Sequence, residues 1–243
     1  SGDILNAPGI LKEEMRRLGS LILEAADATA VPAGSALAVD RLKFSHYIEE
    51  KLCRQPGLEI IREEMSLLPQ DMPVIIATGP LTSPALSQTI AGLTNSQYLY
   101  FYDAIAPIIE GESIDYDKTF RASRYGEGEG DYLNCPMEKD EYDRFWEMLL
   151  HGREAPLKTF EEPKFFEGCL PIEVIAKRGA NTLAFGPMKP VGLTNPKTGR
   201  QPYAVVQLRQ ENNSATLFSI VGFQTKLTWP EQARIFRTIP GLE

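Results

Sequence analysis

The sequence predicts an α/β protein in two units, and two observations lead to that prediction. In the first 95 residues, helical apolar repeats alternate with short apolar runs, and residues 74–77 form a continuous apolar run typical of a buried parallel strand. Past residue 96 this alternation gives way to an aromatic run, a helix and two strands joined by a tight turn. We therefore expect a unit over 1–95 with a parallel sheet, and an α+β unit over 96–243 with antiparallel strands.

Three polar residues mark the starts of helices in the first unit. Asn6, Asp40 and Ser83 each stand before a helical apolar repeat, where a side-chain oxygen can accept a hydrogen bond from the first turn. The repeats predict helices over 7–22, 41–53 and 84–93. Short apolar runs between them predict strands at 36–39, 58–61, 64–68 and 74–77.

The second unit combines amphipathic helices with strands. An apolar stripe that includes Tyr142 and Phe145 predicts a helix over 138–150, and residues 212–214 predict a hairpin turn. Alternating glycine and glutamate at 126–130 predict a flexible acidic loop. Further helices are expected at 171–178 and 230–239, and strands at 98–102, 182–185, 203–210 and 216–223.

Composition limits the classes of protein to consider. The chain has 243 residues, 25 Lys and Arg against 33 Asp and Glu, and a formal net charge of −8. No apolar run reaches membrane-spanning length and no basic-then-apolar signal segment opens the chain, which favours a soluble, cytoplasmic protein without membrane contact. Three cysteines at unrelated spacings and two histidines argue against a disulfide framework and against a metal site.

Charge is distributed unevenly along the second unit. Residues 110–170 hold sixteen acidic and eight basic side chains, whereas residues 171–209 hold one acid, Glu173, and six bases. A basic face could meet a phosphate backbone, although a solvated face whose charges pair across the domains is the simpler explanation. The six bases are Lys177, Arg178, Lys189, Lys197, Arg200 and Arg209.

Two patterns within this basic stretch could serve a ligand. Residues 186–192 hold two glycines, two prolines and one cation, so they form either a stiff loop that presents Lys189 or a rigid crossover between strands. Tyr203, Gln207 and Arg209 alternate along one predicted strand. Such a polar stripe suits a ligand or an interface, but it is also common on half-buried sheets.

Cys169 is the first candidate for a reactive side chain. It lies two residues before Pro171, which is expected to open the short helix over 171–178. At a helix N-terminus, unpaired backbone N–H groups and the helix dipole favour an anion and lower the pKa of a thiol. The alternative is a packed cysteine, because cysteine is among the most often buried residues.

The other two cysteines rank lower. Cys135 also stands near a predicted helix start, but the acidic first turn at 138–141 opposes a thiolate, so Cys135 is the second candidate for catalysis. Cys53 ends the predicted helix over 41–53 and is expected to be a core residue.

Seven segments, in order and through the whole chain, carry a resemblance to a known family. They are ALAVDR (36–41), IIATGPLTS (75–83), YLYFYDA (98–104), YLNCPM (132–137), FFEGCLPIEVIAKRG (165–179), FGPMKPVGL (185–193) and PYAVVQLRQ (202–210). The sequence resembles the TrmFO family of FAD- and folate-dependent tRNA (uracil-5-)-methyltransferases, which are relatives of the GidA-type flavoproteins.

The resemblance implies an activity and its cofactors. A one-carbon unit would pass from methylenetetrahydrofolate to C5 of the T-loop uridine of tRNA, position 54, with reduced FAD as the reductant and NAD(P)H as the source of electrons. Residues 1–95 would then be part of a Rossmann-like FAD-binding domain, and residues 96–243 an inserted domain that binds tRNA.

The resemblance also assigns roles to residues. Cys169 matches a cysteine proposed as the nucleophile, whose addition to C6 of uracil would make C5 nucleophilic. Thr78, Gly79 and Pro80 match the turn beside the flavin, and Met65 falls where related flavoproteins contact adenine through the backbone. In the basic stretch, Arg178, Lys189 and Arg209 are the expected RNA-binding residues.

One departure from the family pattern leaves alternatives open. No strand is followed by the G-x-G-x-x-G turn that holds the FAD pyrophosphate. We therefore expect a flavin domain present only in part, which by itself does not hold FAD tightly. The alternatives are a non-catalytic RNA-binding or interaction fragment of such an enzyme, and a flavin oxidoreductase unrelated to RNA with Cys169 as a redox thiol.

Overall fold

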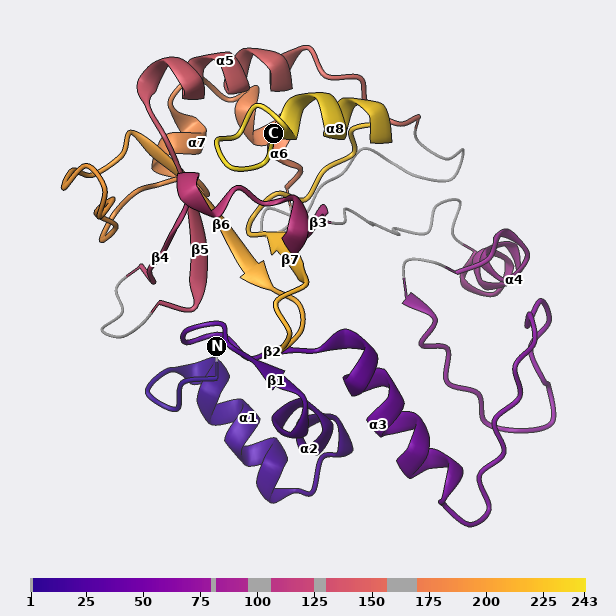
Figure 1. Ribbon diagram of the computed structural model, residues 1–243. Helices are drawn as coiled ribbons and strands as arrows, with labels where there is room; N and C mark the ends of the chain where they lie inside the picture. Colours follow the sequence, from indigo (N-terminus) through magenta and orange to yellow (C-terminus); the bar gives the residue numbers. More distant parts are fainter. Residues whose placement is uncertain (1, 80–81, 96–105, 125–129, 157–169) are drawn as a thin grey trace.

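The protein is described from a computed structural model that covers residues 2–79, 82–95, 106–124, 130–156 and 170–243. The first part of the chain is mostly helical, and the second is a five-stranded sheet with helices packed on one face (Figure 1). The predicted boundary near residue 96 falls at the edge of the undescribed residues 96–105, and it stays a prediction.

The chain begins with two helices where the sequence predicted one. Asn6 caps α1 (Ala7–Arg17) through a hydrogen bond from the Gly9 amide, as expected. Gly19 then takes a positive φ of 72°, and Ser20 caps a new helix, α2 (Leu21–Ala28). A residue in the left-handed region cannot continue an α-helix. The prediction of one continuous helix over 7–22 was therefore wrong.

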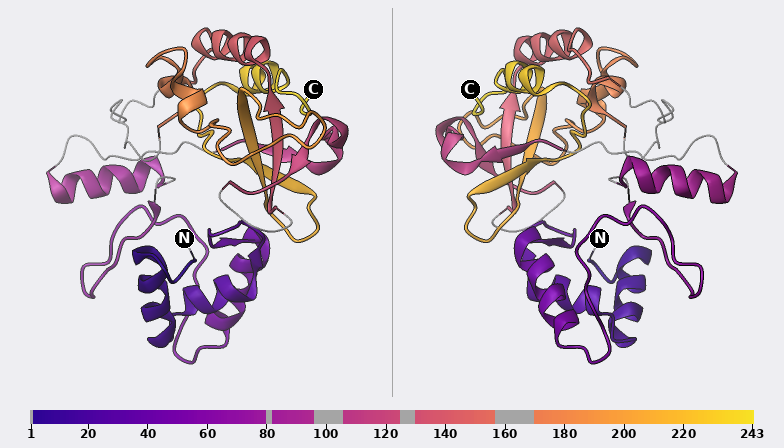
Figure 2. Two further views of the ribbon diagram at one scale, coloured as in Figure 1. Left: turned by 90° about the vertical axis from the view of Figure 1, so that its left-hand side faces the viewer. Right: turned by 90° about the vertical axis from the view of Figure 1, so that its right-hand side faces the viewer.

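Two further helices begin at the predicted caps. Asp40 accepts a hydrogen bond from the Lys43 amide and starts α3 (Arg41–Cys53). Ser83 accepts one from the Leu86 amide and starts α4 (Pro84–Thr94), which Figure 2 shows standing apart from the first three helices. Both predictions are confirmed.

The parallel sheet predicted for the first unit is absent from the described residues. The strands β1 (Ala30–Val31) and β2 (Ala38–Val39) pair antiparallel with each other as a two-stranded sheet. Residues 54–78 contain no helix or strand. The prediction of strands at 58–61, 64–68 and 74–77 was therefore wrong. Ile75, expected in a buried strand, is 93% exposed, and no strand of the described residues pairs with this segment.

The antiparallel sheet predicted for the second unit is confirmed. Its strand order is β3-β7-β6-β5-β4, and every neighbouring pair is antiparallel. The predicted turn at 212–214 joins β6 to β7. The strands are β3 (Ile108–Glu110), β4 (Phe120–Arg121), β5 (Tyr132–Met137), β6 (Ala204–Gln210) and β7 (Leu217–Ile220), with 3₁₀ turns at Gly111–Ser113 and Tyr116–Lys118 after β3.

Four helices pack on one face of this sheet. The helix predicted over 138–150 is α5 (Lys139–Leu150), with Glu138 and Glu141 forming a capping box. The helix predicted over 171–178 is shorter, α6 (Ile172–Ala176), and the last predicted helix is α8 (Trp229–Phe236). The strand predicted at 182–185 is instead the helical turn α7 (Thr182–Phe185). Periodicity does not separate a helix from a strand in so short an apolar run.

The main core lies between the sheet and these helices. Along β5 and β6 the alternate residues Leu133, Cys135, Val206 and Leu208 point into it and are almost fully buried, together with Phe145 of α5. The intervening residues of the same strands point to the opposite face of the sheet. That second face carries polar side chains.

Candidate functional site

The second face of the sheet is the candidate site, because it gathers polar side chains from three neighbouring strands, β5, β6 and β7. Tyr132 of β5 lies directly opposite Arg209 of β6, and Arg209 lies opposite Ser219 of β7. One step along the strands, Asn134 of β5 lies opposite both Gln207 of β6 and Phe120 of β4. The predicted polar stripe of β6 therefore becomes part of a polar face that spans the sheet.

Asn134 is at the centre of this face and is fully buried. Its amide nitrogen lies within 3.0–3.2 Å of the carbonyl oxygens of Phe120, Ala122 and Tyr132, and its oxygen accepts a 2.9 Å hydrogen bond from Gln207. Buried polar groups are stable when they are bonded in this way. The amide thus holds β4 and the following loop to β5, which is a structural role.

Arg209 is a partly buried cation on this face. Its Nη2 donates to the Glu211 carboxylate at 3.0 Å and to the Ser219 hydroxyl at 3.3 Å, and its buried Nε has no hydrogen-bond partner. Across the strand pair, burial raises the pKa of Tyr132, whereas the nearby charges of Arg209 and Arg124 act to lower it. The face therefore has cationic character beside a phenol.

The loop that carries Lys189 reaches the same face. Arg124, which sequence reasoning missed, donates a 2.9 Å hydrogen bond from Nη2 to the carbonyl of Pro187. The carbonyl of Met188 accepts from the Val205 amide at 2.9 Å, which fixes the loop against β6. These two bonds hold residues 187–188 beside β6.

Two other predicted residues lie elsewhere. Arg178 follows α6 on the helix-covered face, so the structure does not place it beside Arg209. Tyr203, predicted to share the stripe with Gln207 and Arg209, packs its ring edge-on against Tyr142 of α5, with centroids 5.1 Å apart. The predicted polar stripe is correct for Gln207 and Arg209, which lie within β6. It is wrong for Tyr203, which precedes the strand.

Cys169 lies outside the described residues, but the helix that follows it is described. In α6 the Ile172 amide donates to the carbonyl of Gln224 at 2.7 Å, and the Val174 and Ile175 amides donate to the carbonyl of Pro171. Three of the first amides of this five-residue helix are therefore already bonded, which weakens the helix-terminus explanation for a low thiol pKa, and the role of Cys169 stays a prediction.

Glu173 is a buried acid next to this turn, and sequence reasoning missed its role. It is 1% exposed, and its carboxylate accepts hydrogen bonds from the Lys226 amide at 2.7 Å and the Thr225 hydroxyl at 3.0 Å. Burial raises its pKa, and these donors act in the opposite direction. Together with the Ile172 bond, they clamp the turn after Leu170 onto residues 224–227.

The structure corrects what was expected of the other two cysteines. Cys135 does not lie at a helix N-terminus but inside β5, fully buried opposite Val206. Burial raises the pKa of its thiol to about 12, which disfavours the nucleophilic thiolate. Cys53, expected in the core, is exposed at the end of α3.

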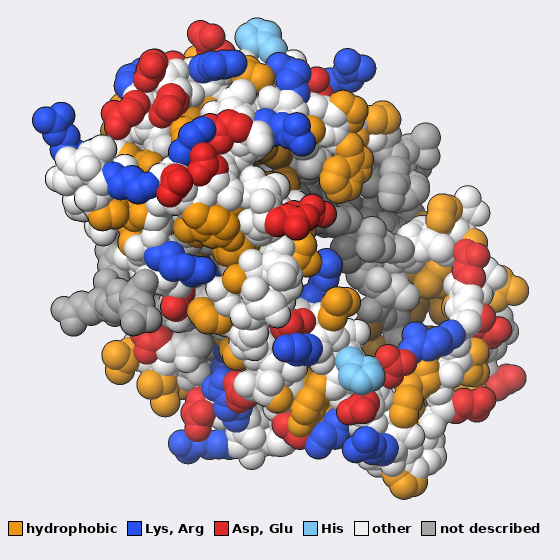
Figure 3. All heavy atoms as spheres, viewed as in Figure 1, with side chains coloured by type: hydrophobic (Ala, Val, Ile, Leu, Met, Phe, Trp, Pro, Cys, Tyr) orange, Lys and Arg blue, Asp and Glu red, His pale blue; other side chains and the backbone are white. Residues whose placement is uncertain are grey.

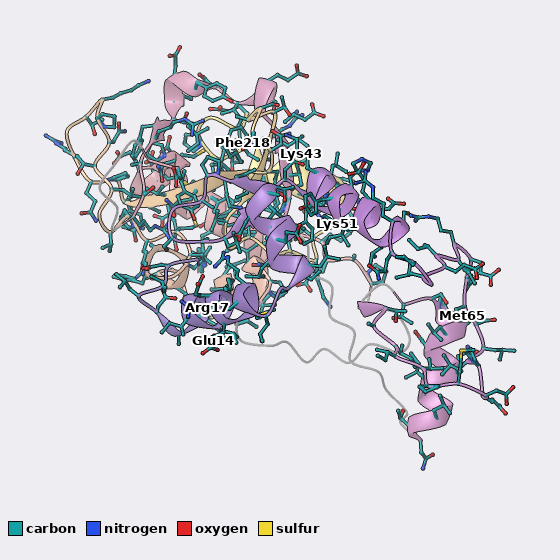
Figure 4. The ribbon with its side chains drawn as sticks, turned by 90° about the horizontal axis from the view of Figure 1, so that it is seen from below. Glu14, Arg17, Lys43, Lys51, Met65 and Phe218 are labelled. Atoms are coloured by element: carbon teal, nitrogen blue, oxygen red, sulfur yellow. The ribbon has the colours of Figure 1, made fainter. Side chains whose placement is uncertain are left out.

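The residues matched to FAD lie in and after the exposed 54–78 segment. Gly79 has a positive φ of 68° and open space where a side chain would start, which fits a close approach of a cofactor to the backbone. Thr78 and Thr82 join their hydroxyls at 2.6 Å across this turn. Met65 is 46% exposed, far from Phe218 of β7 in Figure 4. Pro80 lies outside the described residues.

The turn therefore fits a flavin, but the strand that should support it does not form. A dinucleotide site needs a strand that delivers its turn to the cofactor. Residues 74–77 are exposed and unpaired with any strand of the described chain. The described residues alone do not form a complete FAD-binding site.

Comparison with known proteins decides the family. A family model described as "Glucose inhibited division protein A" matches residues 2–243. The chain belongs to this family.

Within this family the chain is similar to proteins named methylenetetrahydrofolate–tRNA-(uracil-5-)-methyltransferase TrmFO. It is 67% identical over 243 residues to that of Syntrophus aciditrophicus, covering 100% of this chain and 55% of the relative. The match to Heliobacterium modesticaldum is 62% over 98% of this chain and 54% of the relative, and that to Geobacter sulfurreducens is 59% over 98% and 55%. The chain thus spans about half the length of these curated relatives.

These matches confirm the resemblance read from the seven sequence segments. The described ranges also bear on membrane spans and metal sites. None of the helices there is long and apolar enough to cross a membrane. Among the same residues, no three His, Cys, Asp or Glu side chains gather in an arrangement that could hold a metal ion.

Proposed function

We propose that this chain takes part in methylating C5 of the T-loop uridine of tRNA, with methylenetetrahydrofolate as the one-carbon donor. FAD is the redox cofactor, NAD(P)H supplies its electrons, and the reaction takes place in the cytoplasm. One observation carries the proposal: 67% identity, over all 243 residues, to a relative named for this reaction. Because the chain spans 55% of that relative, the proposal concerns the part of the reaction that these residues supply.

Cys169 is the nucleophile in this proposal. Its thiolate adds to C6 of the uracil, forming a sulfur–carbon bond and moving the C5=C6 electron pair into an enolate. C5 then attacks the methylene carbon carried by the folate. Loss of the C5 proton and cleavage of the bond between the methylene carbon and the folate nitrogen release tetrahydrofolate and leave an exocyclic methylene on C5. Reduced FAD, when bound, would supply the hydride that converts this methylene to a methyl group. Expulsion of the thiolate from C6 then restores the C5=C6 bond and free Cys169.

The remaining assigned residues have supporting roles. The clamp at Glu173 fixes the turn that follows Cys169 in sequence. Buried Cys135 is left out of the chemistry, since a thiol with a pKa near 12 is protonated at neutral pH. Thr78, Gly79, Pro80 and Met65 are the proposed flavin-side residues, with the open position at Gly79 in support.

Substitution of Cys169 tests the proposal. In the full enzyme, Cys169→Ser should abolish methylation of tRNA and also the covalent adduct with tRNA that contains 5-fluorouracil. The matched control is Cys53→Ser, because Cys53 is exposed on α3 and lies outside the proposed chemistry. Methylation at the unmodified rate by the Cys169 variant would refute the nucleophile assignment.

A second candidate is an RNA-binding module that does not itself retain flavin. The exposed, unpaired 54–78 segment favours it, because the flavin-side turn lacks a supporting sheet. Purified chain of residues 1–243 should then bind tRNA and show little flavin absorbance. Absorbance at one flavin per chain would rule this candidate out.

The two cationic groups near the sheet predict how tRNA is held. The loop that carries Lys189 is held beside β6 through Pro187 and Met188, whereas Arg178 follows α6 on the helix-covered side. We propose that the Lys189 side faces the RNA backbone. Lys189→Glu should then weaken tRNA binding and flatten its salt dependence more than Arg178→Glu does. Equal effects of the two reversals would argue against a single RNA-facing side.

A further inference from the structure

Residues 194–201 form a small hairpin that no proposed role has yet used. Asn195 and Arg200 pair as an isolated antiparallel bridge, and the Gly199 amide donates to the Asn195 carbonyl at 2.8 Å. The Asn195 side chain accepts from the Lys197 amide at 3.0 Å, and the Thr198 hydroxyl accepts from the Arg200 amide at 3.3 Å. These local bonds hold the tip in one conformation.

The hairpin is anchored to the edge of the sheet. Leu193, just before it, is 1% exposed and packs with Phe120 of β4 and Val205 of β6. From the tip, Lys197 donates a hydrogen bond to the carbonyl of Asp117. The hairpin therefore projects from a fixed base, and Figure 1 shows it as the orange segment that stands out beside β4 and β5.

The charge of the hairpin is positive. Residues 196–201 are all exposed, and between Glu173 and Glu211 the sequence contains no acid. In the described structure neither Lys197 nor Arg200 is paired with a carboxylate, whereas nearby Lys118 is paired with Asp115 and Glu243. Cationic side chains stand out from the surface on this side of the molecule in Figure 3.

We infer that this hairpin is a contact for the phosphate backbone of RNA, made by Lys197 and Arg200. The inference rests on the proposed function, which supplies tRNA as the partner. The tip has no aromatic side chain on which a base could stack, so the contact is to phosphate and independent of sequence. Because the tip is already ordered, it loses little conformational freedom when it binds.

Salt-dependent binding of the full chain to an unmodified tRNA transcript tests the inference. The double variant Lys197→Gln/Arg200→Gln removes both charges and the Lys197 bond to the Asp117 carbonyl, and leaves the backbone bonds within the hairpin in place. Its plot of log affinity against log salt should be less steep by about 1.5, with roughly tenfold weaker binding at low salt. The matched control is Lys12→Gln/Arg144→Gln, which removes one half-exposed lysine and one exposed arginine from α1 and α5.

The outcomes separate this inference from the proposed function. A smaller slope in the hairpin variant, with an unchanged slope in the control, supports the contact. An equal decrease of the slope in both variants would show a general effect of net charge, and would overturn the contact proposed for the hairpin. If the unmodified chain binds tRNA normally and the hairpin variant has an unchanged slope, the hairpin contact is overturned and the proposed function is not. Failure of the unmodified chain to bind tRNA overturns both.

Discussion

The hydroxyl of Tyr132 donates a 2.8 Å hydrogen bond to the backbone carbonyl of Ala33, a residue 99 positions earlier in the chain. Beside it, the Gly34 amide donates to the carboxylate of Asp131. Gly34 has a φ of 58°, and a side chain there would start 3.4 Å from the Tyr132 ring. These paired bonds fasten the loop between β1 and β2 to the start of β5, and so join the helical N-terminal part to the sheet.

Removing the Tyr132 hydroxyl should loosen this junction. Tyr132→Phe deletes one hydrogen bond, and we expect a loss of about 1 kcal/mol in the free energy of unfolding. Hydrogen exchange should be faster at residues 30–39, and urea unfolding should show the loss of stability. Tyr116→Phe is the control, since Tyr116 is 49% exposed. Unchanged exchange at 30–39 would mean that this bond does not hold the loop.

The described cysteines should differ sharply in reactivity. At pH 8, iodoacetamide should modify exposed Cys53 in the native chain and leave Cys135 unmodified, because burial raises the pKa of Cys135 to about 12. In urea both should react. Peptide mass spectrometry measures each site separately. Modification of native Cys135 as fast as Cys53 would contradict its place in the core.

Buried Glu173 should make stability depend on pH. Burial raises its folded pKa above the ordinary 4.5, so the folded chain binds this proton more tightly than the unfolded chain. Its contribution to stability is therefore complete below pH 4.5 and is lost as pH rises through the folded pKa.

The comparison with Glu173→Gln isolates this effect. Relative to the variant, the unmodified chain should lose free energy of unfolding as pH rises above 4.5. Urea unfolding over a pH series measures the difference, and Glu147→Gln on α5 is the exposed control. Around Glu173, the Lys226 amide and the Thr225 hydroxyl act to lower the pKa of its carboxyl group. The charge of Glu154 acts, like burial, to raise that pKa. A difference that does not vary with pH would contradict the assigned shift.

Asn134 should be costly to replace. Asn134→Ala leaves the Phe120 and Ala122 carbonyls and the Gln207 amide without this partner inside the protein. We expect a loss of about 1–3 kcal/mol in the free energy of unfolding, measured with urea. Asn213→Ala, at an exposed position of the β6–β7 turn, should cost much less. Similar losses in the two variants would show that the buried network is dispensable.

The features that the sequence predicted well depend on neighbours in the chain. The caps at Asn6, Asp40 and Ser83 use hydrogen bonds to amides three residues away, so a local pattern contains all the information required. The β6–β7 hairpin likewise depends on a short turn between two alternating runs. The family resemblance also came from the sequence, because it rests on ordered identities rather than on geometry.

The features that it predicted poorly depend on distant partners. The run at 74–77 has the composition of a strand, but a strand forms only where another backbone pairs with it, and within the described ranges none does. Cys135 looked like a helix-terminal residue, yet pairing with Val206 of β6, 71 residues later, buries it. No local signal marks Glu173 either, because its partners lie at 225 and 226.

The sequence by itself thus determined the helix starts at Asn6, Asp40 and Ser83, the hairpin of the last two strands, and the family. Only the tertiary structure decided which side chains share a face. It held residues 187–188 beside β6, placed Arg178 after α6 on the helix-covered side, and bonded the Ile172, Val174 and Ile175 amides of α6. The physical reason is that capping and turn preferences act over a few residues, whereas burial and charge pairing depend on segments that meet only after the chain has folded.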